Sequence, residues 1–177
     1  MATCIFTKDE HVVYASNGIC IVEDVKKISF VKGEPEKLYY ILRPKNDKNS
    51  TIYIPEDNEM LLSRMRTPIT AAELETIVTN AKNSDCEWIE DRKQRSTHYR
   101  ELLMNPHPSL LLPTVKIISK KYTELAEMGK KLSAADREAF ESAMRFIKDE
   151  FAFSLDNNTE KAHEYIEMAI GTIPHIA

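Results

Sequence analysis

Short apolar runs separated by turn-forming residues dominate the chain from His11 to about Pro55. The runs HVVYASNGICIVEDVKKISF, KLYYILRP and STIYIP are rich in Val, Ile and Tyr, which favour β-strands. Asn17-Gly18 and the polar tract 45–50 supply turns between the runs. We therefore expect four or five short strands that form a small curled sheet or barrel.

Apolar residues at helical spacing replace this pattern after Pro68. Thr70, followed three residues later by Glu73, fits a capping box and predicts a helix that continues to Lys82. A second helix, which carries Trp88 near its start, is expected from about residue 87 to residue 104.

The proline-rich segment 105–108 ends this second helix, because proline lacks the backbone N–H that a helix needs. Two more helices are expected to open near Ser109 and Ser133, and the polar segment 157–159 separates the second of these from a last helix that carries Tyr165, Ile166 and Ile170. The order of strands followed by helices predicts an α+β fold with two small domains. Residues 1–68 would form the β domain, and residues 69–177 a compact all-α domain of about five helices.

Composition and charge narrow the class of protein. The 177 residues are 42% hydrophobic, which is ample for packed cores, and no stretch approaches the length of a membrane-spanning helix. The N-terminal residues lack the pattern of a secretory signal, so we expect a cytoplasmic protein. Cys4, Cys20 and Cys86 show no CxxC spacing, so neither a disulfide framework nor a metal site is indicated, and no cofactor is expected.

The net charge of −4 conceals an asymmetry. Residues 88–121 hold 7 Lys/Arg and 3 Asp/Glu, whereas residues 122–177 hold 6 and 11. Only the middle of the chain is therefore suited to a polyanion.

The second expected helix concentrates the residue types that bind nucleic acid. At helical spacing Trp88, Arg92, Arg95 and Tyr99 fall in one stripe, with Lys93 beside it. An aromatic ring can wedge against a base, and guanidinium groups can hold phosphates. The alternative is that Trp88 and Tyr99 are core anchors while the arginines reach outward to solvent.

Two further groups of residues are candidate contacts. Lys116 and Lys120 could extend a phosphate-facing surface, although a solvated helix face explains them equally well. In the β-rich part, an exposed sheet edge could accept a strand from another protein. The candidates there are the strand residues Thr51, Ile52 and Tyr53 and the neighbouring Lys26, Lys27 and Ile28.

Catalytic motifs are not visible in the sequence. The five histidines form no HxxxH or HExxH arrangement, and there is no Gly-rich phosphate loop or GxSxG motif. We therefore do not expect an enzyme. An active site assembled from distant residues remains the alternative.

Taken together, these segments resemble the bacterial CarD/CdnL transcription regulators, whose N-terminal module also occurs in transcription-repair coupling factors. The resemblance is carried by VVYASNGICIVEDV, YYILRPKNDKNSTIYIPED, WIEDRKQRSTHYRELL and KKLSAADREAFESAMRFIKDEFAFSL. It implies a Tudor-like N-terminal barrel that binds the β subunit of RNA polymerase. It also implies a helical domain that meets promoter DNA at the upstream edge of the transcription bubble, without reading its sequence. Separately, we expect the protein to be a monomer.

In this resemblance Trp88 corresponds to the tryptophan wedge of the family and would favour the open complex, with Arg92, Arg95 and Lys93 on phosphates. Glu90 and Asp91 stand where many relatives carry arginines. The competing hypothesis is therefore an adaptor that keeps the polymerase-binding module without productive DNA contact.

Overall fold

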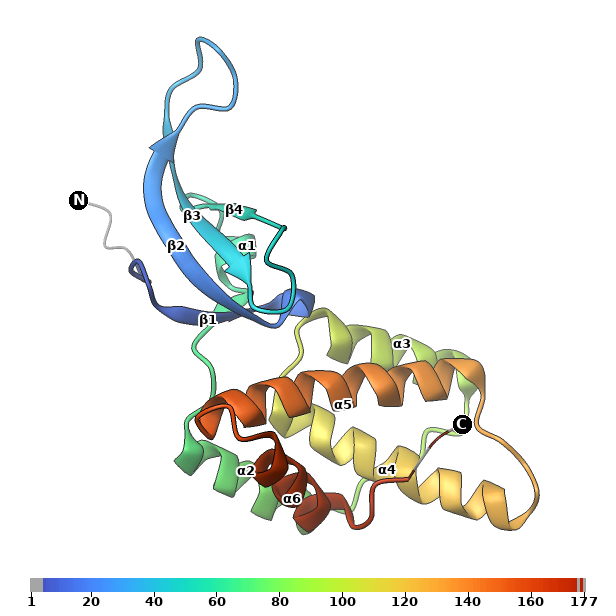
Figure 1. Ribbon diagram of the computed structural model, residues 1–177. Helices are drawn as coiled ribbons and strands as arrows, with labels where there is room; N and C mark the ends of the chain where they lie inside the picture. The colour runs from blue at the N-terminus through green and yellow to red at the C-terminus, as the bar shows by residue number, and fades with distance from the viewer. Residues whose placement is uncertain (1–4, 175, 177) are drawn as a thin grey trace. The chain divides into compact units, whose positions relative to one another are not determined.

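The computed structural model describes residues 5–174 and residue 176 and has an α+β fold, as predicted (Figure 1). Its backbone contacts divide into two units, one ending at Pro68 and the other beginning at Ile69. The first unit holds the strands and the second holds the long helices.

One antiparallel five-stranded sheet, of order β4-β3-β2-β1-β5, forms the first unit. The strands are β1 (His11–Tyr14), β2 (Ile19–Ile28), β3 (Lys37–Pro44), β4 (Ile52–Pro55) and β5 (Met65–Arg66). A 3-10 turn η1 (Ala15–Asn17) joins β1 to β2, and a short helix α1 (Glu59–Leu62) precedes β5. The sequence pattern did not predict α1 or β5, because these elements are too short to show the periodic spacing of apolar residues that marks a helix or a strand.

The β2–β3 pair is a long curved hairpin (Figure 1). Its register shifts between Val22 and Asp24, the mark of a β-bulge, which increases the local twist of the sheet. Strands β4 and β5 are the outermost strands, and within the described residues no ladder joins them. The described sheet is therefore open, and the expected barrel is not confirmed.

The concave side of the sheet carries the first core. Alternate residues of the strands, among them Val12, Val22, Tyr40, Leu42 and Ile54, are fully buried there. The Tyr40 hydroxyl accepts a hydrogen bond from the Ile5 amide at 2.9 Å, so the one polar group of this large ring is paired.

Five helices form the second unit within the described residues: α2 (Ala71–Lys82), α3 (Arg92–Met104), α4 (Pro108–Glu127), α5 (Ala134–Ser154) and α6 (Thr159–Ile170). Leu74, Leu111, Ile118, Phe151 and Ile166 are among the buried residues of their shared core. Helix α5 packs on α3, α4 and α6, and α6 also contacts α2 and α4.

The helix boundaries follow from local capping. Thr70 and Glu73 form the predicted capping box at the start of α2. Ser133 caps α5, as expected. Pro113 lies inside α4 near its start, and Thr114 of the same turn donates its hydroxyl to the Leu110 carbonyl at 2.9 Å.

Candidate functional site

An exposed cluster of aromatic rings lies on the convex side of the sheet. Phe30, in the loop between β2 and β3, is 61% exposed and meets both Tyr39 and Tyr53 edge-on, with ring centroids 5.2 Å apart in each pair. Tyr53, on the outermost strand β4, is itself 44% exposed. We call Phe30, Tyr39 and Tyr53 the aromatic cluster; large exposed rings of this kind are typical of protein interaction surfaces.

The cross-strand register brings two predicted contact residues to this cluster. Lys26 of β2 lies directly opposite Tyr39, and Tyr39 lies opposite Pro55, two residues along the strand from Tyr53. Directly opposed residues share a face of the sheet, so Lys26 and Tyr53 flank Tyr39 on one side. Lys26 also forms an ion pair with Asp24 at 3.2 Å.

The other predicted residues of the sheet are spread over both faces. Thr51 is exposed beside β4, whereas Ile52 is half-buried and packs against the concave core. Lys27 and Ile28 lie at the end of the hairpin, opposite Leu38 and Lys37. Phe30 and Tyr39 were not among the predicted contacts, although the exposed pair Phe30-Val31 in a polar loop was a usable signal.

Trp88 does not lie on a helix, which corrects the predicted helix from about residue 87. Helix α3 begins at Arg92, because the Asp91 carboxylate caps it by accepting a hydrogen bond from the Gln94 amide at 2.7 Å. Trp88 therefore lies in the irregular segment 83–91 between α2 and α3, and the predicted stripe of Trp88 with the α3 residues does not form.

Arg95 is buried rather than presented to solvent, with 5% of its surface exposed. Its Nε and Nη2 donate to the two carboxylate oxygens of Asp136 on α5, at 2.7 and 3.1 Å. Its Nη1 donates to the carbonyls of Ile89 and Glu90, at 2.6 and 3.1 Å. The predicted phosphate contact at Arg95 is therefore replaced by a buried ion pair that ties α3 to α5.

The electrostatics of this pair follow from its surroundings. Burial alone would raise the pKa of the Asp136 carboxyl, but the hydrogen bonds from Arg95 and Ser133 outweigh burial and lower it. The hydrogen bond to Asp136 likewise raises the pKa of Arg95. Both groups are therefore charged at neutral pH.

Trp88 is half-buried against the helical core and contacts two cations. The Arg95 guanidinium carbon lies 4.2 Å from the centre of the indole ring, and the Lys121 ammonium lies 5.6 Å from it. Both distances are within the range of cation–π attraction. Lys121 was not among the predicted contacts, since its position 33 residues further along the chain gives no local signal.

Two more predicted DNA contacts have structural roles. Tyr99 is buried, and burial raises the pKa of its hydroxyl. The Lys116 ammonium donates to the carbonyls of Ala81, Lys82 and Ser84 at 3.0, 2.7 and 3.0 Å, and so satisfies the C-terminal end of α2. Neither side chain is available to a phosphate in this arrangement.

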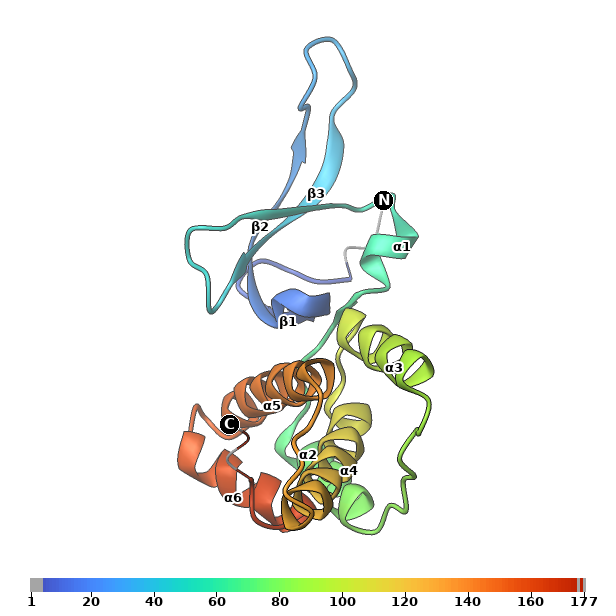
Figure 2. The ribbon, with the colours of Figure 1, turned by 90° about the vertical axis from the view of Figure 1, so that its right-hand side faces the viewer.

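Of the cations predicted to contact DNA, Arg92, Lys93 and Lys120 remain exposed. Arg92 and Lys93 open α3, and Lys120 lies on α4, directly before Lys121 in the sequence. Figure 2 shows these two helices. Acidic side chains are interleaved with them, and Glu90 lies 3.9 Å from the Lys121 ammonium. We call Trp88, Arg92, Lys93, Lys120 and Lys121 the tryptophan surface.

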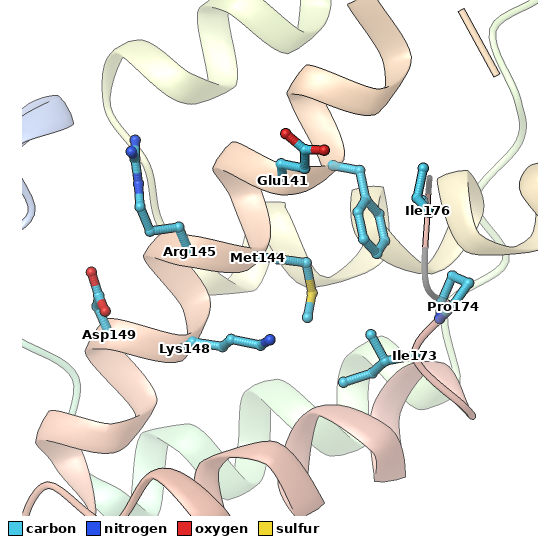
Figure 3. Close-up of a pocket in the computed structure, with 9 residues that line it drawn as sticks. Glu141, Met144, Arg145, Lys148, Asp149, Ile173, Pro174 and Ile176 are labelled. Carbon is cyan, nitrogen blue, oxygen red and sulfur yellow. The ribbon is translucent and has the colours of Figure 1, made fainter. Parts of the chain in front are cut away.

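A separate groove of about 450 Å³ lies between α5 and the residues Ile173, Pro174 and Ile176 (Figure 3). Met144 and Lys148 point toward Ile173, whereas Arg145 and Asp149 point away from it. The lining mixes both signs of charge with apolar side chains, so it does not extend the basic surface. Among the described residues no three His, Cys, Asp or Glu side chains gather as metal ligands.

Comparison with known proteins identifies the first unit alone. Residues 6–66 match the sequence model of the CarD-like/TRCF RID domain, and residues 67–177 lie outside the match. A search of curated proteins gives no match to the chain. In the described part of the chain, no helix combines the length and the apolar character needed to span a bilayer.

Proposed function

We propose, on the premise that residues 6–66 of this chain are a CarD-like/TRCF RID domain, that the protein is a transcription regulator that binds RNA polymerase. In this proposal the sheet unit is Tudor-like and binds the β subunit, and the helical unit contacts promoter DNA and stabilises the open complex. The protein acts as a cytoplasmic monomer, without a cofactor and without enzymatic activity. The match over residues 6–66 is the observation that carries the proposal.

The polymerase contact is assigned to strand β4 and the aromatic cluster. Strand β4 is the outermost strand on its side of the described sheet, so its outward backbone groups can pair with an added strand. Rings that are already packed against one another lose little side-chain entropy on binding, and Lys26 adds a cation beside them. Backbone pairing would supply affinity, and the rings would supply specificity.

The DNA contact is assigned to the tryptophan surface. A half-buried indole in an irregular segment can act as a wedge against an unstacked base step. Arg92, Lys93 and Lys120 would hold backbone phosphates, which positions a protein on DNA without reading its sequence. Binding to polymerase raises the effective concentration of this surface at the promoter, so weak intrinsic DNA affinity is sufficient.

An adaptor without productive DNA contact is the second candidate. It is favoured by the acids beside the tryptophan surface, since Glu90 approaches Lys121 and Asp91 is used as a helix cap. The two functions differ in their dependence on salt. A phosphate contact weakens as salt is added, whereas an adaptor has no salt-sensitive affinity for DNA.

The lifetime of the open complex tests the proposal. Purified bacterial polymerase on a promoter is compared without the protein, with the protein, and with its Trp88→Ala form. We expect the protein to lengthen the lifetime and Trp88→Ala to abolish this effect while polymerase binding is retained. A protein that binds polymerase but leaves the lifetime unchanged would be the adaptor.

A further inference from the structure

We infer that Arg95 is a positioning residue, which holds Trp88 in the orientation that reaches DNA. The inference rests on the proposed function, because it concerns how the same surface is presented. It assigns to Arg95 a role different from the phosphate contact expected from the sequence.

The first step is the anchorage of the arginine itself. Its planar fork makes a two-point contact with the Asp136 carboxylate, which fixes both the position and the tilt of the guanidinium plane. Asp136 is fixed in turn, because it lies in the first turn of α5 and accepts a hydrogen bond from the hydroxyl of the helix cap Ser133 at 2.5 Å. The guanidinium is thus attached to α5 as well as to α3.

The second step is the hold on the irregular segment. The remaining nitrogen of the fork donates to the carbonyls of Ile89 and Glu90, the two residues that directly follow Trp88. These hydrogen bonds fix the backbone where no helix or strand does so.

The third step is direct contact with the ring. The centre of the indole lies 4.2 Å from the guanidinium carbon, which places the cation against the π system. One side chain therefore sets both the backbone after Trp88 and the plane of its ring. Lysine cannot replace it, because a single ammonium group lacks the planar fork and the stacking surface.

Fluorescence of the full-length protein tests this step without polymerase, because Trp88 is the only tryptophan in the chain. In Arg95→Lys and in Asp136→Asn we expect acrylamide to quench the emission more strongly and the emission maximum to move to longer wavelength. Arg100→Lys is the matched control, since Arg100 is exposed on the same helix. Circular dichroism identifies which variants are folded, and either folded variant gives the result.

The open-complex lifetime then relates position to function. We expect Arg95→Lys to shorten the lifetime roughly threefold to tenfold, the loss expected from one cation–ring contact, with polymerase binding unchanged. A folded Arg95→Lys or Asp136→Asn protein with the quenching of the original protein would overturn the positioning role, whatever the polymerase assay gives. If Trp88→Ala leaves the lifetime unchanged but Arg95→Lys alters quenching, the proposed function fails and the positioning stands.

Discussion

The Arg95–Asp136 ion pair is a buried charge interaction between α3 and α5, with side-chain exposures of 6% on both partners. Two charges removed from water stabilise a fold only when their hydrogen bonds are satisfied. Here all three guanidinium nitrogens donate, and the carboxylate also accepts from Ser133. Removal of either partner therefore leaves a buried charge without its counter-charge.

The pair gives stability a dependence on pH. A carboxyl with a pKa lower in the folded than in the unfolded state stabilises the fold above its ordinary pKa of about 3.9. This contribution is lost as the pH falls through the lowered value of Asp136. We expect Asp136→Asn to lower the free energy of unfolding at pH 7 by about 3 kcal/mol.

Urea unfolding at pH 7 and pH 3 measures this effect. The difference between Asp136→Asn and the original protein should shrink at pH 3, since the Asn variant has no ionised group to lose at this position. Glu141→Gln, at an exposed position on the same helix, serves as the control. An equal difference at the two pH values would contradict the assignment.

Contacts between individual residues could be predicted from the sequence where the two residues are close along the chain. Thr70 and Glu73 form their predicted capping box because they are three residues apart. The burial of Arg95 could not be predicted in this way, since Asp136 is 41 residues away. An arginine beside a tryptophan has the same local sequence whether it faces phosphate or carboxylate.

At the scale of elements, the C-terminal end of α2 depends on a side chain from α4. Lys116 donates to three carbonyls there, and its loss removes these hydrogen bonds, although the Ala81 carbonyl still accepts from Ser84. We expect Lys116→Met to lower the free energy of unfolding by about 1 to 3 kcal/mol. Lys120→Met, one turn further along, should change it by less than about 0.5 kcal/mol.

In a DNA-binding assay the effects of the two substitutions should be reversed, with Lys120→Met now having the larger effect. In the polymerase–promoter complex, Lys120→Met should weaken the salt-dependent part of the interaction, because it removes the phosphate contact that we propose for Lys120. A folded Lys116→Met protein should retain it. Thermal or urea unfolding together with lifetimes at two salt concentrations separates these roles, and the reverse order would refute them.

The edge strand β4 is the element to which polymerase binding is assigned. Tyr53→Ala removes the exposed ring without altering the buried partner side of the strand, and we expect about tenfold weaker binding to polymerase. Met60→Ala, at another exposed apolar side chain of the sheet unit, should have little effect. Fluorescence anisotropy with labelled full-length protein measures both, and equal affinities for the two variants would exclude the aromatic cluster.

Helix starts show where element prediction reached its limit. Ser84, Asp85 and Asp91 can all cap a helix, and the predicted start near residue 87 corresponds to a cap at Ser84 or Asp85. The structure uses Asp91, because Arg95 satisfies the carbonyls of Ile89 and Glu90 outside a helix. The start of α3 is therefore set by a tertiary contact, which the helical spacing of apolar residues cannot predict.

At the scale of the whole molecule, we propose that two surfaces of one chain have different roles: the aromatic cluster binds polymerase, and the tryptophan surface contacts DNA. The sheet unit would set the concentration at which the protein acts, and the tryptophan surface would set the size of its effect. The sequence predicted the α+β class because strands and helices differ in the spacing of their apolar residues. Whether the sheet closes depends on its edge strands β4 and β5, which are too short to show such a spacing.

Titration of the variants tests this division. Tyr53→Ala should require a higher protein concentration for the same open-complex lifetime and should recover the full effect when saturated. Trp88→Ala should fail at every concentration. If saturation does not restore the Tyr53 variant, the two surfaces do not act independently.

The Arg95–Asp136 pair also constrains how the sequence can change over evolutionary time. Because each member alone is a buried charge, a lineage that loses one gains little by keeping the other. We expect homologous chains to hold both residues or to replace both together, as pairs in contact do. The residue at position 88 should then vary with the pair, since loss of Arg95 removes the cation that packs against the indole.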